Sequence, residues 1–322
     1  MSYWKETFKI GNVEIPRFIG GPMASFTDSP FRAMVREFSP DSLLYSEITH
    51  LNNLIHDADN KALRFDQSER PLNFQVTTNS TEYIEHACEK ISASGVDMVD
   101  LNIGCPARNV IGSGSGSALM GNVLLLKDVF KLFRKSLAIP FTVKMRAGFK
   151  EKNASYVAQL AQDEGVDALV IHPRMQTKKF TGKADFALVS EIKKNLSIPV
   201  IFSGNIIDAQ SAISCYEQTG VDGLMVSRAL CGAPWKLQKL QVTVEDRSFC
   251  IGSDRVLEVA LLHLSRMLDY YGPHGLYMFR KHLACYLKGG PDASEYRHRL
   301  IRLDSVEAVK NGLKVFFRTR SE

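Results

Sequence analysis

Between Ser94 and Ile103 the chain reads SGVDMVDLNI, a glycine followed by a run that is mostly apolar. Glycine commonly ends a helix, because it adopts the left-handed backbone conformation of a helix C-cap without strain. The triplet Gly-Val-Asp recurs at 165–167 and 220–222, each time directly before another apolar run. This repetition predicts a helix that leads into a buried strand at three places along the chain.

Short apolar runs of this kind occur eight times before residue 230, and helix-like segments separate most of them. The runs cover residues 17–20, 43–46, 72–76, 98–103, 141–145, 168–172, 199–203 and 223–227. Several are rich in Val, Ile and Leu without alternation, which is typical of parallel strands covered on both faces. Eight βα units favour an α/β fold of the (β/α)8 TIM-barrel type over an open sheet.

The two ends of the chain differ from this repeat. Residues 8–15 read as a hairpin that turns at Gly11-Asn12, and we expect it to close the floor of the barrel. After Trp235 no further apolar run of the strand type occurs, and the pattern of apolar residues from Asp254 onward is helical. We therefore predict a barrel domain over residues 1–240 and a C-terminal all-helical domain over residues 241–322.

The composition of the 322 residues is that of an ordinary globular protein, with 45% hydrophobic and 23% charged residues. The formal net charge of +5 permits a polyanionic partner without requiring one. The sequence contains no apolar run of membrane-spanning length and no apolar signal core near its start. The six cysteines form no CxxC pair, so we predict no metal site. We expect a cytoplasmic monomer that binds no membrane.

The chemistry of a TIM barrel takes place at the C-terminal ends of its strands, which makes the set of candidates short. The polar or chemically active residues at these ends include Gln75, Asn102, Cys105, Lys144, His172 and Arg174. The loops after the seventh and eighth strands commonly bind phosphate through backbone N–H groups. Ser203-Gly204-Asn205 and Ser227-Arg228 occupy these positions, so we predict a phosphate site there. The alternative is a plain turn beside a surface arginine.

Two residues, Lys144 and Cys105, raise specific chemical hypotheses. A charged Lys144 on a barrel strand needs a partner, and an anionic cofactor would provide one. The Cys105 thiol could protonate a carbon atom or act as a nucleophile, and residues 111–117 after it have the Gly/Ser-rich composition of a mobile flap. The alternatives are an idle loop thiol at Cys105 and a hydrogen-bonded core histidine at His172.

Six short motifs follow one another along nearly the whole chain: PMASFTD at 22–28, DLNIGCP at 100–106, GSAL at 116–119, TVKMRAG at 142–148, HPR at 172–174 and RKH at 280–282. Together they resemble the flavin-dependent tRNA-dihydrouridine synthases, particularly their bacterial B-type subgroup. The segment Asn-x-Gly-Cys-Pro is the most specific of them.

The resemblance implies a reaction and a cofactor site. FMN reduced by NADPH would give a hydride to C6 of a uridine in tRNA, and Cys105 would give a proton to C5. The product would be 5,6-dihydrouridine. A cysteine thiol suits proton donation because it is ordinarily neutral at pH 7. The residues that would hold the cofactor are Pro22, Met23, Ala24, Gln75, Lys144, His172, Ser203, Gly204, Asn205, Ser227 and Arg228.

The resemblance also implies an RNA site. Asn102 would hydrogen-bond the uracil edge, while His172 and Arg174 would help to orient the base and backbone. Lys178, Arg280 and Lys281 would contact the RNA backbone. Residues 280–302 are basic, with Tyr286 and Tyr296 interleaved, which suits phosphate contact. The alternative is a solvated helix face.

Two other functions remain open at this point. A flavin barrel could act on a small molecule, although such a substrate needs no basic helical tail. A non-catalytic RNA-binding barrel is the second alternative, because 203–205 and 227–228 depart from the usual Asn-Gly-Asp and Gly-Arg patterns of the family. The second alternative assumes a barrel that has lost its catalytic activity. Against this, the chain keeps Gln75, Asn102, Cys105, Lys144, His172 and Arg228.

Overall fold

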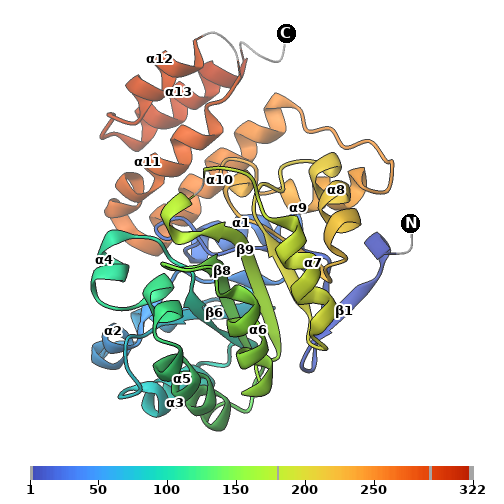
Figure 1. Ribbon diagram of the computed structural model, residues 1–322. Helices are drawn as coiled ribbons and strands as arrows, with labels where there is room; N and C mark the ends of the chain where they lie inside the picture. Colours follow the sequence, from blue (N-terminus) through green and yellow to red (C-terminus); the bar gives the residue numbers. More distant parts are fainter. Residues whose placement is uncertain (1–2, 180, 290–291, 319–322) are drawn as a thin grey trace.

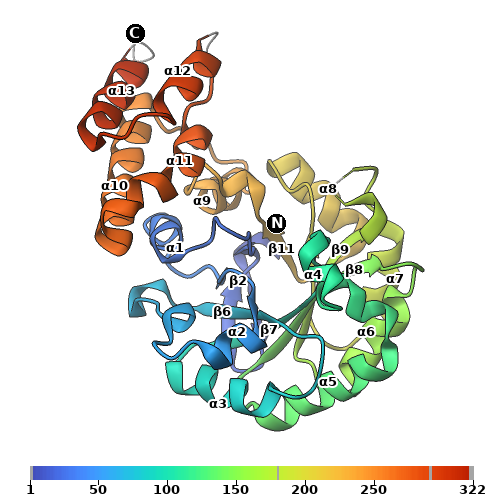
Figure 2. The same cartoon turned by 90° about the vertical axis from the view of Figure 1, so that its left-hand side faces the viewer.

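The computed structural model describes residues 3–179, 181–289 and 292–318 of the chain. Eight parallel strands among these residues close into a barrel, in the order β3-β4-β6-β7-β8-β9-β10-β11 and back to β3 (Figures 1 and 2). They are β3 (Phe18–Gly20), β4 (Leu44–Tyr45), β6 (Leu72–Thr77), β7 (Met98–Ile103), β8 (Phe141–Gly148), β9 (Ala168–Met175), β10 (Val200–Ser203) and β11 (Gly223–Val226). A short strand β5 (Thr49–His50) also pairs with β6. The predicted TIM barrel is confirmed, with one barrel strand at each of the eight apolar runs.

Helices lie between successive strands of the barrel, and most of them cover its outside. They are α1 (Ser29–Arg36), α2 (Leu51–His56), α3 (Ile84–Ser94), α4 (Arg108–Gly112), α5 (Val123–Ser136), α6 (Ala154–Asp163), α7 (Phe186–Asn195) and α8 (Ala209–Thr219). Gly95 and Gly220 cap α3 and α8 in the left-handed conformation, with φ of 80° and 65°. The glycines of the repeated triplet therefore stop the helices as the sequence predicts.

The aspartate of each Gly-Val-Asp triplet has a structural task of its own. Leu72 is the first residue of β6, and its backbone N–H donates to Asp97 Oδ2 at 2.8 Å. Asp167 and Asp222 accept the N–H groups of Phe141 at the start of β8 and Val200 at the start of β10 in the same way. Each carboxylate thus satisfies a backbone donor at the beginning of a neighbouring strand, where the ladder leaves it unpaired.

The N-terminal hairpin lies at the floor of the barrel, as expected. Its strands, β1 (Thr7–Ile10) and β2 (Val13–Pro16), pair in antiparallel fashion around Gly11. Ile10 and Ile15 are fully buried in a core that also contains Val170 and Met225 from the barrel strands. The lower half of the barrel is therefore packed with apolar side chains, and an open cavity can exist only toward the other end.

The C-terminal part is helical and leans against one side of the barrel (Figure 2). Its helices are α10 (Ser253–Tyr271), α11 (Gly275–Tyr286), α12 (Ala293–Leu300) and α13 (Val306–Arg318), and α9 (Lys236–Thr243) precedes them on the barrel. A second hydrophobic core lies within it and includes Met34 of α1 and Trp235 from the barrel side. The proposed boundary at 240/241 falls inside α9, whose Leu237 and Leu240 pack into the barrel core. The division into two domains stays a prediction.

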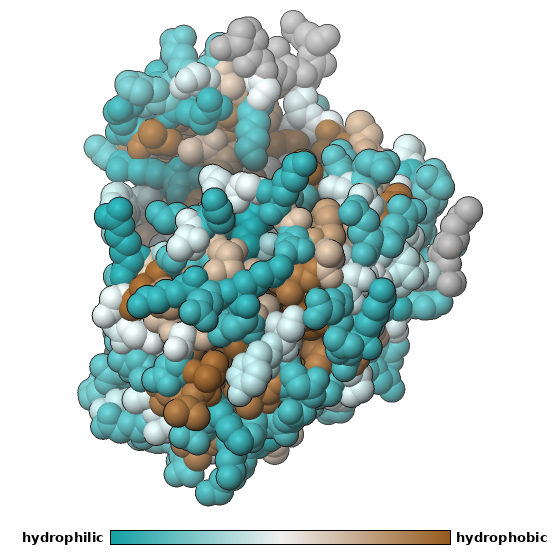
Figure 3. All heavy atoms as spheres, viewed as in Figure 1, coloured by the Kyte–Doolittle hydropathy of each residue, from teal (hydrophilic) through white to brown (hydrophobic). Residues whose placement is uncertain are grey.

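The surface agrees with the ordinary composition. Hydrophilic residues predominate on the face shown in Figure 3. Within the part of the chain that the structure describes, no helix has the length and apolarity needed to cross a membrane.

Candidate active site

A cavity of about 740 Å³ lies at the C-terminal ends of the barrel strands. This volume is in the usual range for pockets that hold cofactors or small molecules. Thirteen of the residues singled out from the sequence line it: Pro22, Met23, Ala24, Gln75, Asn102, Cys105, Lys144, His172, Ser203, Gly204, Asn205, Ser227 and Arg228. The barrel thus brings together residues from seven strand ends that are up to about 200 positions apart in sequence.

Strand alternation explains why the cavity wall is polar on one side. Gln75 on β6 pairs in register with Asp100 on β7, and Asn102 on β7 pairs with Lys144 on β8. Gln75 and Asn102 project into the cavity with Lys144, whereas the alternate positions of the same strands pack against the helices. Polar residues in the middle of buried strands are costly unless they are paired, so their presence here marks a site.

Asn102 fixes the loop that carries Cys105. Its side-chain Oδ1 accepts the backbone N–H of Gly104 at 3.0 Å and that of Cys105 at 2.8 Å. The carbonyl of Gly104 accepts Arg146 Nε at 2.7 Å, and the carbonyl of Cys105 accepts Ser117 Oγ at 2.9 Å. The backbone on both sides of the thiol is therefore held by side chains, and the half-buried Cys105 lines the cavity.

The Gly/Ser-rich segment after Cys105 has a defined structure, and the mobility expected of it stays a prediction. It forms α4 and the 3₁₀ helix η4 (Gly116–Gly121), and the side chains of Ser115 and Ser117 are fully buried. Ser115 Oγ lies 3.0 Å from His50 Nε2, and the Gly116 N–H donates to Thr77 Oγ1. Small residues are needed here because the segment packs closely against the Cys105 loop: a Cβ at Gly116 would lie 3.1 Å from the Cys105 carbonyl oxygen.

Positive charge gathers on one wall of the cavity. Burial, and then the nearby charge of Arg146, lower the pKa of Lys144 to about 8, and burial lowers the pKa of Arg146 to about 10. Burial, together with Lys144, Arg146 and Arg174, holds the pKa of His172 far below its usual value. His172 is therefore a neutral imidazole at pH 7, and the remaining cations favour an anionic ligand.

The predicted phosphate turns lie in the same cavity, with Gly204 beside His172 and Arg174. Gly204 has a φ of 146°, and a Cβ at this position would lie 3.3 Å from Arg174 Nη1 and 3.4 Å from the His172 ring. Arg174 Nη1 is buried and has no hydrogen-bond partner among the described residues. Burial and then the charge of Arg228 lower the pKa of Arg174. Two neighbouring guanidinium groups, one with an unused donor, fit an anion such as a phosphate.

Four of the predicted substrate-binding residues lie outside the cavity wall. Arg174 lies behind Gly204 and donates from Nε to the carbonyl of Gly182 at 3.0 Å. Lys178 lies exposed on the 3₁₀ helix η5 (Gln176–Lys178). Arg280 forms an ion pair with Asp304, and Lys281 approaches Asp28 of the barrel at 3.9 Å. Both α11 residues thus have partners within the chain.

The structure adds residues that were not among the predicted site residues. Arg146, Arg108 and Lys179 line the cavity. Arg146 is the most buried of them, and it joins the Cys105 loop to the η5 segment through the carbonyls of Gly104 and Lys179. Its position two residues after Lys144 on the same strand was the signal for it, because alternate residues of a strand share a face.

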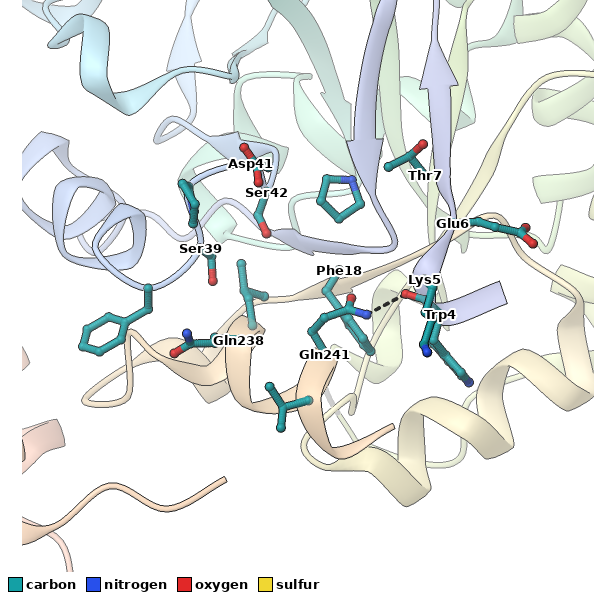
Figure 4. Close-up of a pocket in the computed structure, with 15 residues that line it drawn as sticks. Trp4, Lys5, Glu6, Thr7, Phe18, Ser39, Asp41, Ser42, Gln238 and Gln241 are labelled. Atoms are coloured by element: carbon teal, nitrogen blue, oxygen red, sulfur yellow. Dashed lines mark hydrogen bonds between the residues drawn. The ribbon is translucent and has the colours of Figure 1, made fainter. Parts of the chain in front are cut away.

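A second cavity, of about 270 Å³, lies beside the N-terminal hairpin (Figure 4). Residues from the N-terminal segment, the 38–42 loop and α9 surround it, and Gln241 Nε2 donates to the carbonyl of Trp4 across it. It shares no lining residue with the larger cavity, which contains the thirteen residues named above. The larger cavity is therefore the candidate active site.

No three His, Cys, Asp or Glu side chains come together as metal ligands in the described ranges.

A closed parallel barrel with a cavity at its strand ends, polar and cationic on one wall, defines a TIM-barrel enzyme. Two solved structures share this fold. Histamine dehydrogenase from Rhizobium sp. 4-9 has a TM-score of 0.59 at 12% identity and covers all of this chain and 65% of its own. A variant of NCR from Zymomonas mobilis has a TM-score of 0.57 at 14% identity, covering 79% and 94%.

Sequence relatives identify the family. The dihydrouridine synthase (Dus) family model matches residues 19–320. A Synechocystis protein named probable tRNA-dihydrouridine synthase 1 is 31% identical over 315 residues, which cover 96% of this chain and 88% of its own length. The tRNA-dihydrouridine synthase B of Pseudomonas aeruginosa is 30% identical over 320 residues, covering 97% and 96%. The chain belongs to the dihydrouridine synthase family, and the predicted resemblance, including that to B-type members, is confirmed.

Proposed function

We propose that this protein reduces the C5–C6 double bond of uridine in tRNA to 5,6-dihydrouridine, with FMN as cofactor and NADPH as reductant. Family membership supports the reaction. The observation that carries the assignment to this site is the position of Cys105, held by Asn102 and Ser117 at the edge of a cationic cavity. A thiol at that position can donate a proton to a flat ring lying in the cavity.

The residues at the phosphate turns fit FMN. Gly204 would allow the phosphate to approach the backbone, while Arg174 and Arg228 would neutralise its charge. Pro22, Met23 and Ala24 would lie along the ring system, with Gln75 and Lys144 toward its polar edge. The chemistry that FMN supplies when bound is the transfer of a hydride, taken from NADPH, to C6 of the uracil. Lys144 would stabilise negative charge at the polar edge of the ring.

Cys105 would complete the reduction at C5. Its S–H bond breaks as the new C–H bond forms, and solvent returns a proton to the thiolate. The neutral His172 imidazole and the remaining amide N–H of Asn102, both in the cavity wall, would hydrogen-bond the uracil edge. The target base must leave its stack to reach the cavity. We propose further that the helical region 241–322 and the exposed Lys178 contact the RNA backbone, and that the enzyme acts as a monomer.

The Cys105→Ala variant tests this proposal. We expect it to bind FMN with unchanged affinity but to form dihydrouridine about 10²–10⁴-fold more slowly, the usual contribution of a general acid. The measurement is dihydrouridine in tRNA lacking this modification, with NADPH consumption followed in parallel. The Cys250→Ala variant is the control, because Cys250 is exposed and away from the cavity.

The same assay separates the proposal from its alternatives. Undiminished product from Cys105→Ala would remove the proton-donor role. Reduction of free uridine at the rate seen with tRNA would favour a small-molecule reductase. A protein that takes up no FMN and still binds tRNA would favour a non-catalytic RNA-binding barrel.

A further inference from the structure

Three buried side chains form a hydrogen-bonded line that begins behind the cavity wall and continues along it. Gln75 Nε2 donates to Asp100 Oδ2 at 2.8 Å, and Asn102 Nδ2 donates to Gln75 Oε1 at 2.8 Å. The line ends where Asn102 Oδ1 accepts the backbone N–H groups of Gly104 and Cys105. A continuous set of contacts therefore joins Asp100 to the loop that carries Cys105.

The two ends of this line determine how both amides are oriented. An ionised carboxylate only accepts hydrogen bonds, so the NH2 group of Gln75 must face Asp100. Its oxygen then faces Asn102, whose NH2 group must turn toward it. This leaves the oxygen of Asn102 for the N–H groups of Gly104 and Cys105. A flip of either amide would place two donors or two acceptors against each other in a buried site, which is costly.

Asp100 itself does not touch the cavity. Its side chain is fully buried, and its second oxygen accepts Thr142 Oγ1 at 2.6 Å. Thr142 Oγ1 in turn accepts Asn73 Nδ2 at 2.9 Å. Burial raises the pKa of Asp100 to about 6, and hydrogen bonds from Thr142 and Gln75 and the charge of Lys144 favour its ionised form. The carboxylate is therefore mostly ionised at neutral pH.

We propose that Asp100 is a positioning residue: its carboxylate sets the direction of the Gln75–Asn102 line and thereby holds the Cys105 thiol in place over the cavity. The inference rests on the proposed function where it concerns catalysis. The geometric part concerns only the chain itself, and it is open to measurements that need no turnover.

The first test replaces Asp100 by residues that keep or remove its acceptor. In Asp100→Leu the line loses the group that orients it, and we expect kcat to fall about 10²-fold with little change in the KM for tRNA, as for a displaced catalytic group. Asp100→Asn keeps an oxygen for Gln75 and should restore most of this loss. Thr142→Val is the matched control, because it removes the other partner of Asp100 and leaves the line intact.

The second test measures the Cys105 loop directly. Iodoacetamide alkylation is followed by peptide mass in the protein without substrate, with the exposed Cys250 as internal reference. We expect Cys105 in Asp100→Leu to react several-fold faster than in the parent protein, and Cys250 to react at the same rate. Equal Cys105 rates in the two proteins, or a kcat of Asp100→Leu within twofold of the parent, would overturn the inference.

A reciprocal pair covers the case in which Asp100→Leu does not fold. Gln75→Glu alone places two carboxylates against each other and should loosen the Cys105 loop. Adding Asp100→Asn gives the introduced carboxylate a donor and leaves its other oxygen for Asn102, so the double variant should regain the slow alkylation of the parent. If it reacts as fast as Gln75→Glu alone, the line does not position Cys105. A parent protein that makes no dihydrouridine would refute the proposed function and leave the alkylation result intact.

Discussion

The charge of Lys144 depends on what occupies the cavity. It lies on β8 beside Asn102, and burial with the charge of Arg146 lowers its pKa to about 8, although Asp100 partly opposes the shift. Because the pKa of Lys144 lies close to neutral pH, an anion beside the ammonium group raises that pKa and increases its protonated fraction. The buried lysine is therefore a sensitive reporter of ligand charge.

We expect FMN binding to take up a proton at Lys144. An anionic ligand raises the pKa of Lys144 above 8, so between the two pKa values binding captures a proton and the affinity falls as the pH rises. Calorimetry at pH 8.5 in two buffers of different ionisation enthalpy measures this uptake. Lys144→Met should abolish it, whereas Lys178→Met, at an exposed position, should not. Identical heats in both buffers would contradict the assignment.

At the scale of the secondary-structure elements, the Gly-Val-Asp triplets explain how the barrel repeats. Each glycine ends a helix, and each aspartate satisfies the first backbone N–H of an adjacent strand. The carboxylates also meet cations: Asp167 pairs with Arg134 at 2.7 Å, and Asp222 pairs with Lys193 at 2.7 Å. The triplet therefore joins a helix end and two strands, which a single apolar run cannot do.

The Asp222→Ala substitution measures this contribution. It leaves the N–H of Val200 without its acceptor and Lys193 without its partner, so we expect a loss of about 2–3 kcal/mol in the free energy of unfolding. The measurement is urea denaturation at pH 7. Asp163→Ala, at an exposed aspartate near the end of α6, should change the stability by less than about 0.5 kcal/mol. Equal losses in the free energy of unfolding for the two variants would show that the triplet aspartate does not stabilise the barrel.

At the scale of the whole molecule, the two hydrophobic cores meet through a few specific contacts. Met34 and Trp235 belong to the second core although they lie on the barrel side. Lys281 of α11 approaches the buried Asp28, and the exposed Lys288 donates to the carbonyl of Cys231 at 2.9 Å. Two of the basic residues that sequence patterns favour for RNA contact therefore help to hold the helices against the barrel.

This arrangement predicts different effects for two lysines. Lys281→Met should lower the free energy of unfolding by about 1–2 kcal/mol, because it leaves Asp28 with one fewer charged partner. Lys178→Met should leave stability unchanged but reduce the slope of log affinity for tRNA against log salt by about 0.7–0.9. Urea denaturation and binding titrations over a salt series check both. A reduced salt slope with unchanged stability for Lys281→Met would instead place Lys281 on the RNA.

The barrel and most of the cavity wall followed from local patterns in the sequence. Helix-stopping glycines, unbroken apolar runs and the rule that strand ends meet on one side were enough to group Cys105, Lys144 and Gly204. These signals are local because a helix-ending glycine and the apolar run of a covered strand are both recognised from residues close together in the chain. Only the tertiary structure decided which polar groups satisfy one another: Asp100 behind Gln75, Arg146 behind the Cys105 loop, and Lys281 against Asp28. Such pairings depend on distances between strands and helices far apart in the chain, which no local pattern contains.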